Sequence, residues 1–366
     1  MIIKNLLKKI PHACLLYFTY IRSITPRKTV NLFFSKVSRR IGSITPSAHP
    51  YIAVIDITNI CNLRCYHCPT GKKLYGRKPG FIDIDKVKKF MVEYGKYLFV
   101  AHLFSWGEPL MNSNVGRIIR LVRSYRVSTT ISTNLNTKDK ARLEEICESG
   151  LDYLIVSIDG ATQDVYSRYR VGGKLELVME NLHYIKDYKQ RNKLQTPIVE
   201  WQYLIFDHNK HEVEAARILA TNLVDVFNAK SGIVPKQFHV AWFGTKRCPF
   251  LWSNVVLQVD GGIGACCNLI DKEDDFGNLS TDSFKKIWHS KRYKGARSLF
   301  SPKLIDRLEP DLKHPCLNCS LVHLQPHLKE YLQKNVHVRS EDIASVHEDD
   351  TIAVRYSKDK EPVRTD

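Results

Sequence analysis

Three cysteines lie close together early in the chain, at Cys61, Cys65 and Cys68, directly after an apolar run over 51–57 that predicts a β-strand. Three thiolates on one loop can converge on a metal centre, and no fourth cysteine nearby completes the set. A structural zinc site normally has four protein ligands, and His67 would have to supply the fourth. Cysteine sets also hold iron–sulfur clusters, where an iron without a protein ligand is an open site for a substrate.

A second set of cysteines lies toward the end of the chain, at Cys248, the adjacent Cys266 and Cys267, then Cys316 and Cys319. Four of them suffice for one closed [4Fe-4S] cluster, and four cysteines are also a common structural zinc set, so both metals stay open. The chain has 10 cysteines, and the short spacings within the two sets indicate metal binding in a reducing compartment rather than disulfides.

The elements that must position these residues follow a regular alternation from residue 51 onward. Strands are expected over 51–57, 97–104, 128–132, 153–158, 198–206 and 237–241, with helices near 84–95, 113–125, 137–149, 174–190 and 209–221. Strand–helix alternation predicts a parallel sheet with right-handed crossovers, and six such units suggest an incomplete barrel. In α/β sheets of this kind, ligands lie at the carboxyl ends of the strands.

Polar residues suited to ligand binding follow the predicted strands. Glu108 comes after the second strand, and hydroxyl, amide and carboxylate groups come after the third and fourth, at Ser132, Asn134, Ser157 and Asp159. A surface turn or a helix N-cap would explain each of them singly. Asp159 is the most informative, because a carboxylate at a strand end costs desolvation unless it has a partner.

The Cys-x3-Cys-x2-Cys spacing after a first strand resembles the signature of the radical S-adenosylmethionine (radical SAM) superfamily. The resemblance implies a partial (β/α)6 TIM-like barrel in which Cys61, Cys65 and Cys68 are catalytic and hold a [4Fe-4S] cluster, whose fourth iron is chelated by SAM. It further implies reductive cleavage of SAM to a 5′-deoxyadenosyl radical that abstracts hydrogen from a substrate. The family has an aromatic residue where this chain has His67.

The same resemblance implies which residues contact SAM. The segment Gly107-Glu108-Pro109 is similar to the family's glycine–glutamate–proline segment, although Trp106 stands where the first glycine is usual. Arg170, in preference to Arg168, would pair with the SAM carboxylate. The full set of SAM contacts expected from the resemblance is Gly107, Glu108, Ser132, Asn134, Ser157, Asp159 and Arg170.

The region from Cys248 resembles the SPASM domain, a small C-terminal α+β extension of many radical SAM enzymes. Cys248, Gly261 and Cys266 match the start of its pattern, and the turn at Asp260-Gly261-Gly262 predicts a hairpin. A full SPASM domain has seven cysteines and two clusters. This chain offers four ligands, so we expect one auxiliary [4Fe-4S] cluster, with Cys266 preferred over Cys267: Cys248, Cys266, Cys316 and Cys319.

The charge of the chain is unevenly distributed. The net charge is +17, and residues 1–50 hold nine lysines and arginines but no acidic residue. We expect a leader over 1–48 with two short amphipathic helices broken at Pro11 and Pro26, which either contact an anionic membrane or pack on the catalytic domain. No apolar run is long enough to span a bilayer, and no secretory signal is recognised, so a cytoplasmic or membrane-peripheral protein is expected.

Taken together, the sequence predicts a leader over 1–48, a radical SAM core over 50–242, a SPASM-type domain over 243–325 and a polar tail over 326–366. The favoured substrate is a small molecule, a sugar or a glycan-linked compound, and a ferredoxin- or flavodoxin-type reductant is the implied partner. A peptide-modifying or RNA-modifying radical SAM enzyme is the alternative, and a non-catalytic metal-binding protein is a distant one. No separate RNA-binding module is visible, so nucleic acid is not favoured.

Overall fold

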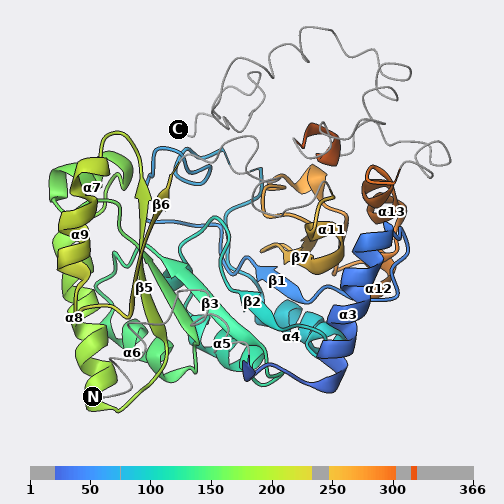
Figure 1. Ribbon diagram of the computed structural model, residues 1–366, viewed down its shortest axis with the longest axis horizontal. Helices are drawn as coiled ribbons and strands as arrows, with labels where there is room; N and C mark the ends of the chain where they lie inside the picture. Colours follow the sequence, from blue (N-terminus) through green and yellow to red (C-terminus); the bar gives the residue numbers. More distant parts are fainter. Residues whose placement is uncertain (1–20, 75, 233–246, 302–314, 320–366) are drawn as a thin grey trace, which may run out of the picture.

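The computed structural model describes residues 21–74, 76–232, 247–301 and 315–319. Within these ranges one sheet of nine strands has the order β6-β5-β4-β3-β2-β1-β7-β8-β9. Its first six strands are mutually parallel, and the sheet does not close on itself (Figure 1). They are β1 (Ile52–Ile55), β2 (Val100–His102), β3 (Ser128–Thr133), β4 (Tyr153–Ser157), β5 (Ile198–Ile205) and β6 (Val226–Ser231). The predicted partial (β/α)6 TIM-like barrel is confirmed.

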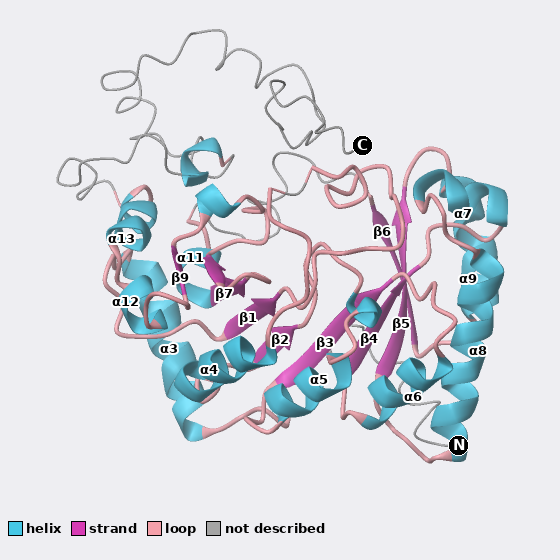
Figure 2. Ribbon diagram, turned by 180° about the vertical axis from the view of Figure 1, so that it is seen from behind, coloured by secondary structure: helices cyan, strands magenta, loops and turns pink. Residues whose placement is uncertain are grey.

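A helix follows each of the first five strands, and these helices line one side of the sheet (Figure 2). Several begin at a side chain that accepts a backbone N–H, such as Asp83 before α4, Asp139 before α6 and Thr162 before α7. The helices are α4 (Ile84–Tyr94), α5 (Val115–Arg123), α6 (Lys140–Glu148), α7 (Gln163–Tyr169), α8 (Leu175–Arg191) and α9 (Val213–Ala220), with single turns of 3-10 helix at η1 (Pro109–Met111) and η2 (Lys210–Glu212).

The face of the sheet beneath the helices is apolar. Residues paired across neighbouring parallel strands point to the same face, so the registers separate the two faces directly. One face carries the row Ile131, Leu154 and Val199, and a further row of Val156 and Trp201. All of these belong to the main buried core, together with residues of the covering helices such as Ile118 and Leu182.

The opposite, inner face of the same strands is polar. Its rows comprise Thr130 with Tyr153, Ser132 with Ile155 and Glu200, and Ser157 with Gln202 and Asn228. Parallel strands that are buried on both faces usually read as continuous apolar runs. Polar residues at every second position therefore indicate an interior built for polar contents.

The C-terminal region extends this sheet rather than forming a separate layer. β7 (Asn254–Leu257) pairs in parallel with β1, and β8 (Gly262–Gly264) and β9 (Gly277–Asn278) follow in antiparallel order. The predicted hairpin at the Gly261 turn is confirmed, and Gly261 adopts a φ of 91° that favours glycine. The remaining elements are α3 (Pro26–Ile41), α11 (Phe250–Ser253), α12 (Phe284–Trp288), α13 (Lys291–Ser298), η3 (Lys272–Asp274) and η5 (Pro315–Asn318).

One strand was misplaced by the sequence interpretation. The sixth strand of the sheet is β6 at Val226–Ser231, paired with β5, whereas the predicted segment 237–241 lies outside the described residues. The strand escaped notice because polar inner-face residues such as Asn228 and Lys230 interrupt its apolar pattern. The first predicted leader helix and the polar tail also lie outside the described residues. Within the described ranges no helix has the length and apolar character needed to cross a bilayer.

Candidate active site at the carboxyl ends of the strands

The loop after β1 carries Cys61, Cys65 and Cys68 and is fixed by hydrogen bonds to its surroundings. Arg64 N donates to Val171 O at 3.0 Å and Tyr66 N to Tyr169 O at 3.2 Å, which ties the loop to the segment after α7. The cysteines pack with Leu63, Leu204, Tyr169 and Phe206 in a small apolar cluster separate from the main core. The structure therefore brings the three cysteines together against apolar side chains, with Cys65 buried and Cys61 and Cys68 partly exposed.

Hydrogen-bond donors face two of the three sulfur atoms. Cys61 Sγ accepts from Leu63 N at 3.4 Å and from Asn134 Nδ2 at 3.7 Å, while Arg170 Nη1 donates to Cys65 Sγ at 3.7 Å. Burial raises the pKa of Cys61 to about 12 and also raises the pKa of Cys65, which Arg170 opposes. Metal binding displaces the thiol protons, and the donors then stabilise the thiolates. This donor set fits the cysteine side of an iron–sulfur cluster.

Glu108 joins the ends of two neighbouring strands. Its buried carboxylate accepts hydrogen bonds from Asn134 N at 2.7 Å, Thr133 Oγ1 at 2.5 Å and Leu110 N at 3.2 Å. Burial raises the pKa of Glu108 against the effect of these donors. Glu108 thus holds the end of β3 against the segment that follows β2, and its backbone N donates to Ile60 O at 2.8 Å in the cysteine loop.

Gly107 lies where two backbone segments come very close to each other. In the structure a Cβ at Gly107 would lie 1.9 Å from Thr58 O, so the close approach is to the backbone that leads into the cysteine loop. A side chain at position 107 would push that loop away from β2.

Asp159 and Arg170 form a buried ion pair. Arg170 Nε lies 2.6 Å from Asp159 Oδ2, and Asp159 Oδ1 accepts from Leu204 N at 2.6 Å. Asp159 is fully buried and Arg170 is nearly so. The partner that a carboxylate at a strand end requires is therefore supplied by the chain itself, and the same guanidinium reaches Cys65.

The inner face of the sheet contributes a ladder of polar groups below the cysteine loop. Ser132 Oγ and Ser157 Oγ are 3.4 Å apart, and Gln202 Nε2 donates to Ser157 Oγ at 3.4 Å. Deeper in the sheet, Glu200 accepts from Tyr153 Oη at 2.6 Å and from Asn228 Nδ2 at 2.9 Å.

Three of these inner-face residues were missed by the sequence analysis: Tyr153, Glu200 and Asn228. The available signal was Glu200 and Gln202 at alternating positions within the otherwise apolar run 198–206. Because the neighbouring residues Val199, Trp201 and Tyr203 face the core, the two polar residues must share the other face.

The second set of cysteines is assembled from three separate segments. Cys248 precedes α11, Cys266 and Cys267 follow β8, and Cys316 and Cys319 lie on or next to η5. Burial raises the pKa of Cys248 to about 12, with a contribution from Cys319, and burial with the charges of Cys248 and Cys319 raises the pKa of Cys316. Cys248, Cys316 and Cys319 are partly buried and pack against the main core.

The adjacent cysteines differ in their surroundings. A hydrogen bond between the two side chains raises the pKa of Cys266 and lowers that of Cys267, and Cys248 adds to the effect on Cys266. Within the described ranges, no three His, Cys, Asp or Glu side chains are placed to hold a single metal ion. The cysteines of a [4Fe-4S] cluster each bind a different iron, so they stand farther apart than the ligands of one ion.

Trp106 and Arg77 contact the C-terminal region. Trp106 Nε1 donates to Cys267 O at 2.9 Å. The buried guanidinium of Arg77 lies 2.9 Å from Asp260 Oδ1 and also pairs with Asp275. The cysteine loop and the C-terminal hairpin are therefore directly linked.

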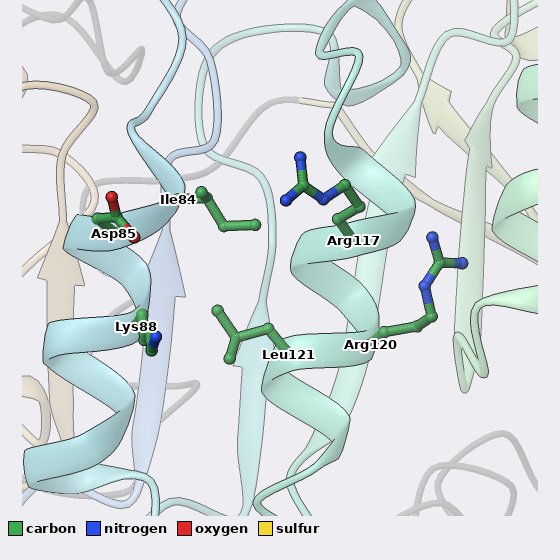
Figure 3. A pocket seen from close by; sticks show the side chains of 6 residues that line it. All are labelled: Ile84, Asp85, Lys88, Arg117, Arg120 and Leu121. Carbon is green, nitrogen blue, oxygen red and sulfur yellow. The ribbon is translucent and has the colours of Figure 1, made fainter.

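A hollow on the surface lies elsewhere. It is formed between α4 and α5 by Ile84, Asp85, Lys88, Arg117, Arg120 and Leu121 (Figure 3). These residues belong to the outer helix layer rather than to the carboxyl ends of the strands, so the hollow is not part of the candidate site.

Comparisons with known proteins match two parts of this chain. Residues 55–216 match the radical SAM superfamily, and residues 248–320 match SPASM, an iron-sulfur cluster-binding domain. Pre-heme d1 synthase of Dinoroseobacter shibae is 28% identical over 129 residues, which cover 35% of this chain and 31% of the relative. Fe-coproporphyrin III synthase of Methanosarcina barkeri is 28% identical over 141 residues, 36% of this chain and 33% of the relative.

A solved structure, BtrN in complex with AdoMet and 2-DOIA, aligns with a TM-score of 0.44 at 17% identity over 71% of this chain and 88% of that one. The matched part spans about a third of the length of the two curated relatives. Residues 55–216 thus form a radical SAM domain, and residues 248–320 form a C-terminal SPASM-type domain. The cofactors predicted from the sequence, a [4Fe-4S] cluster with SAM and an auxiliary iron–sulfur cluster, are confirmed as those of these two families.

Proposed function

We propose that this protein cleaves SAM reductively and uses the product radical to remove hydrogen from a small polar molecule. The observation that carries the proposal is the three-cysteine loop at the carboxyl edge of the sheet, with Asn134 and Arg170 aimed at its sulfur atoms. When bound, the reduced [4Fe-4S] cluster and SAM supply a 5′-deoxyadenosyl radical. The chain supplies the ligands, the orientation and a site from which water is excluded.

Residues around the loop have distinct roles in the proposal. Cys61, Cys65 and Cys68 hold the catalytic cluster. Gly107, Glu108, Ser132, Asn134, Ser157, Asp159 and Arg170 surround the SAM site, either by direct contact or by fixing the strand ends. Glu108 shows how the second role works, because its carboxylate already binds the end of β3. Tyr169 and Phe206, with ring centroids 4.7 Å apart, pack in the same apolar cluster as the cysteines.

The polar inner face supports a substrate rich in hydroxyl or other hydrogen-bonding groups, such as a sugar or a glycan-linked compound. Ser132, Ser157 and Gln202 offer donors and acceptors there, and Glu200 adds a carboxylate that is only 2% exposed. Such groups suit a polar ligand, because hydroxyl, amide and carboxylate groups can extend their hydrogen bonds to the polar groups of a ligand. The two curated relatives are named as synthases of tetrapyrrole-type small molecules, which also favours a small-molecule substrate.

The C-terminal cysteines are proposed to hold one auxiliary [4Fe-4S] cluster through Cys248, Cys266, Cys316 and Cys319. The division of the chain into a core over 50–242 and a SPASM-type domain over 243–325 belongs to the same proposal. A ferredoxin- or flavodoxin-type protein would deliver the electrons, since the chemistry requires one-electron reduction.

Anaerobic reconstitution with iron and sulfide, followed by reduction and addition of SAM, tests the proposal. The wild type should bind iron for about two [4Fe-4S] clusters and release 5′-deoxyadenosine. A C61A/C65A/C68A variant should keep the auxiliary iron and release no 5′-deoxyadenosine. The matched C316A/C319A variant should lose the auxiliary iron but retain some cleavage. Bound zinc and no 5′-deoxyadenosine in the wild type would refute the proposal.

The substrate class has its own test. Cell extract is separated by filtration into a small-molecule fraction and a macromolecular fraction, and each is added to the reconstituted enzyme. The small-molecule fraction should stimulate 5′-deoxyadenosine formation above the rate with SAM alone. E200Q should lose the stimulation and keep the rate with SAM alone. Stimulation by the macromolecular fraction only would favour a peptide or RNA substrate instead.

A further inference from the structure

Helix α3 packs on the protein through its polar side. Its buried residues are Lys28, Asn31, Ser35 and Ser38, spaced as one helical face. Lys28 Nζ donates to Tyr125 O and Arg126 O at 3.1 and 2.7 Å. Asn31 exchanges two hydrogen bonds with the backbone of His49, and Ser35 Oγ donates to Trp252 O at 2.7 Å. The helix is therefore held by side-chain hydrogen bonds to the backbone rather than by apolar burial.

The apolar residues of α3 face outward. Val30, Phe33, Phe34, Val37 and Ile41 are between 37% and 68% exposed and recur at spacings of three and four residues, so they form one stripe. Ile21 and Ile24, in the segment that leads into the helix, are exposed as well. An amphipathic helix normally buries its apolar side, so this reversed orientation leaves a contiguous apolar surface in solvent. Such a surface marks an interaction site.

Basic side chains border the stripe. Arg27, Lys36 and Arg40 are exposed, with Arg27 on one side of the stripe and Lys36 and Arg40 on the other at 100° per residue. The surrounding sequence reinforces the charge, because residues 1–50 contain nine basic and no acidic side chains. An apolar stripe flanked by cations is the pattern of a helix that lies in the plane of a membrane interface.

We propose that the exposed face of α3 binds the surface of an anionic phospholipid bilayer. Charge favours a bilayer over the two alternative binding partners of this face, a second copy of the chain and residues 1–20. A second copy of the chain would bring one basic border against another, and residues 1–20, which carry Lys4, Lys8 and Lys9 without an acidic residue, would do the same. Anionic headgroups complement the border, and the acyl boundary receives Phe33 and Phe34.

The contacts of α3 define how the bound protein faces the membrane. The groups that hold the helix lie at His49, Tyr125 and Trp252, which precede β1, β3 and β7 respectively. The cysteine loop follows β1, at the carboxyl ends of the strands. The helix lies at the side of the molecule close to α12 and α13 (Figure 1). The candidate site therefore opens away from the bilayer, toward substrates in the aqueous phase.

Flotation of the full-length, reconstituted protein with vesicles tests this proposal. We expect binding to vesicles of phosphatidylglycerol and phosphatidylcholine, weak binding to phosphatidylcholine alone, and a decrease with added salt. F33S/F34S should reduce partitioning by at least roughly tenfold, since each phenylalanine contributes its apolar area. R27Q/K36Q/R40Q should reduce it to a similar degree on anionic vesicles only.

Matched controls separate α3 from general effects. I218S/L219S removes two exposed apolar residues from α9 and should leave vesicle binding unchanged. All variants should retain wild-type cleavage of SAM without vesicles, because none of the replaced residues lies at the candidate site. Wild-type protein that does not float with anionic vesicles overturns the proposal, as does unchanged binding by F33S/F34S. A wild-type dimer that F33S/F34S converts to a monomer, without vesicle binding, would assign the face to a second copy instead.

Discussion

Among single residues, Arg170 has the most informative contacts. The sequence resemblance assigned it to the carboxylate of SAM, but its Nε is taken by Asp159 at 2.6 Å and its Nη1 faces Cys65 Sγ at 3.7 Å. A guanidinium beside a thiolate ligand favours the more negative, reduced state of a cluster. We therefore expect Arg170 to raise the reduction potential of the catalytic cluster, with Asp159 as its anchor.

Replacing Arg170 with Gln should lower the midpoint potential of that cluster by roughly 60 mV, equivalent to about a tenfold change for one electron. The measurement is a redox titration followed by electron paramagnetic resonance in the absence of SAM. Arg168→Gln is the control, because Arg168 is an exposed neighbour. An unchanged potential together with weaker SAM binding would contradict the expectation and favour the direct contact with SAM.

A site residue can be recognised from the sequence only where its type and its spacing from other residues form a known pattern. Cys61, Cys65 and Cys68 are recognisable from type and spacing, and so is Glu108. The Arg170–Cys65 contact joins residues 105 positions apart, which no local pattern encodes. Glu200 and Asn228 stayed hidden because a polar residue inside a strand looks like an interruption until the register shows which face it occupies.

At the scale of elements, the loop after the catalytic cysteines is attached to the C-terminal hairpin by Arg77. Its fully buried side chain pairs with Asp260 and Asp275 and donates to Ile270 O at 3.0 Å. Burial raises the pKa of Asp275 to about 6 despite the favourable effect of Arg77. Without the guanidinium, the two carboxylates would face each other with only the weaker effect of Arg292 to compensate.

Arg77→Met should therefore destabilise the protein by about 3–5 kcal/mol at pH 7, the usual cost of breaking a buried pair. The free energy of unfolding is measured by urea denaturation. The loss should be smaller at pH 5 than at pH 7: the pKa of Asp275 is raised in the folded state, so protonation there removes the unpaired charge. Arg217→Met, which breaks an exposed pair with Glu214, should cost below about 1 kcal/mol. An equally small loss for Arg77→Met would show that the loop does not depend on this attachment.

Elements differ in how far sequence determines them. The helices α4, α5, α6, α8 and α9 and the first five strands were predicted because their apolar periodicities are regular, whereas the short helix α7 was missed. The orientation of α3 was not predicted, because an amphipathic helix is normally expected to bury its apolar side. Hydrogen bonds from Lys28, Asn31 and Ser35 to distant backbone groups bury the polar side of the helix instead.

The whole molecule is organised by one continuous sheet. The two family matches divide the chain between residues 216 and 248, yet β7 pairs with β1 over four residues, and Asp56 N donates to Leu257 O at 2.8 Å. The main core likewise includes Ile55 from the first strand and Trp288 from α12. The C-terminal region therefore completes the environment of β1, the strand that precedes the cysteine loop. The boundary proposed near 242–243 stays a prediction. It separates two sequence families and does not imply that the two parts fold independently.

A shared sheet and core predict that the full-length protein unfolds in a single cooperative transition. Calorimetry should give a calorimetric enthalpy equal to the van't Hoff enthalpy, both before and after loading with iron. A chain ended at residue 232 would leave β1 as an exposed edge strand and remove Leu257 and Trp288 from its core, so it should aggregate and bind no catalytic iron. Two separate transitions, or a soluble truncated chain that still binds iron at Cys61, Cys65 and Cys68, would mean that the core folds independently. In that case the contacts of Arg77 and Trp106 would connect two autonomous domains rather than parts of one.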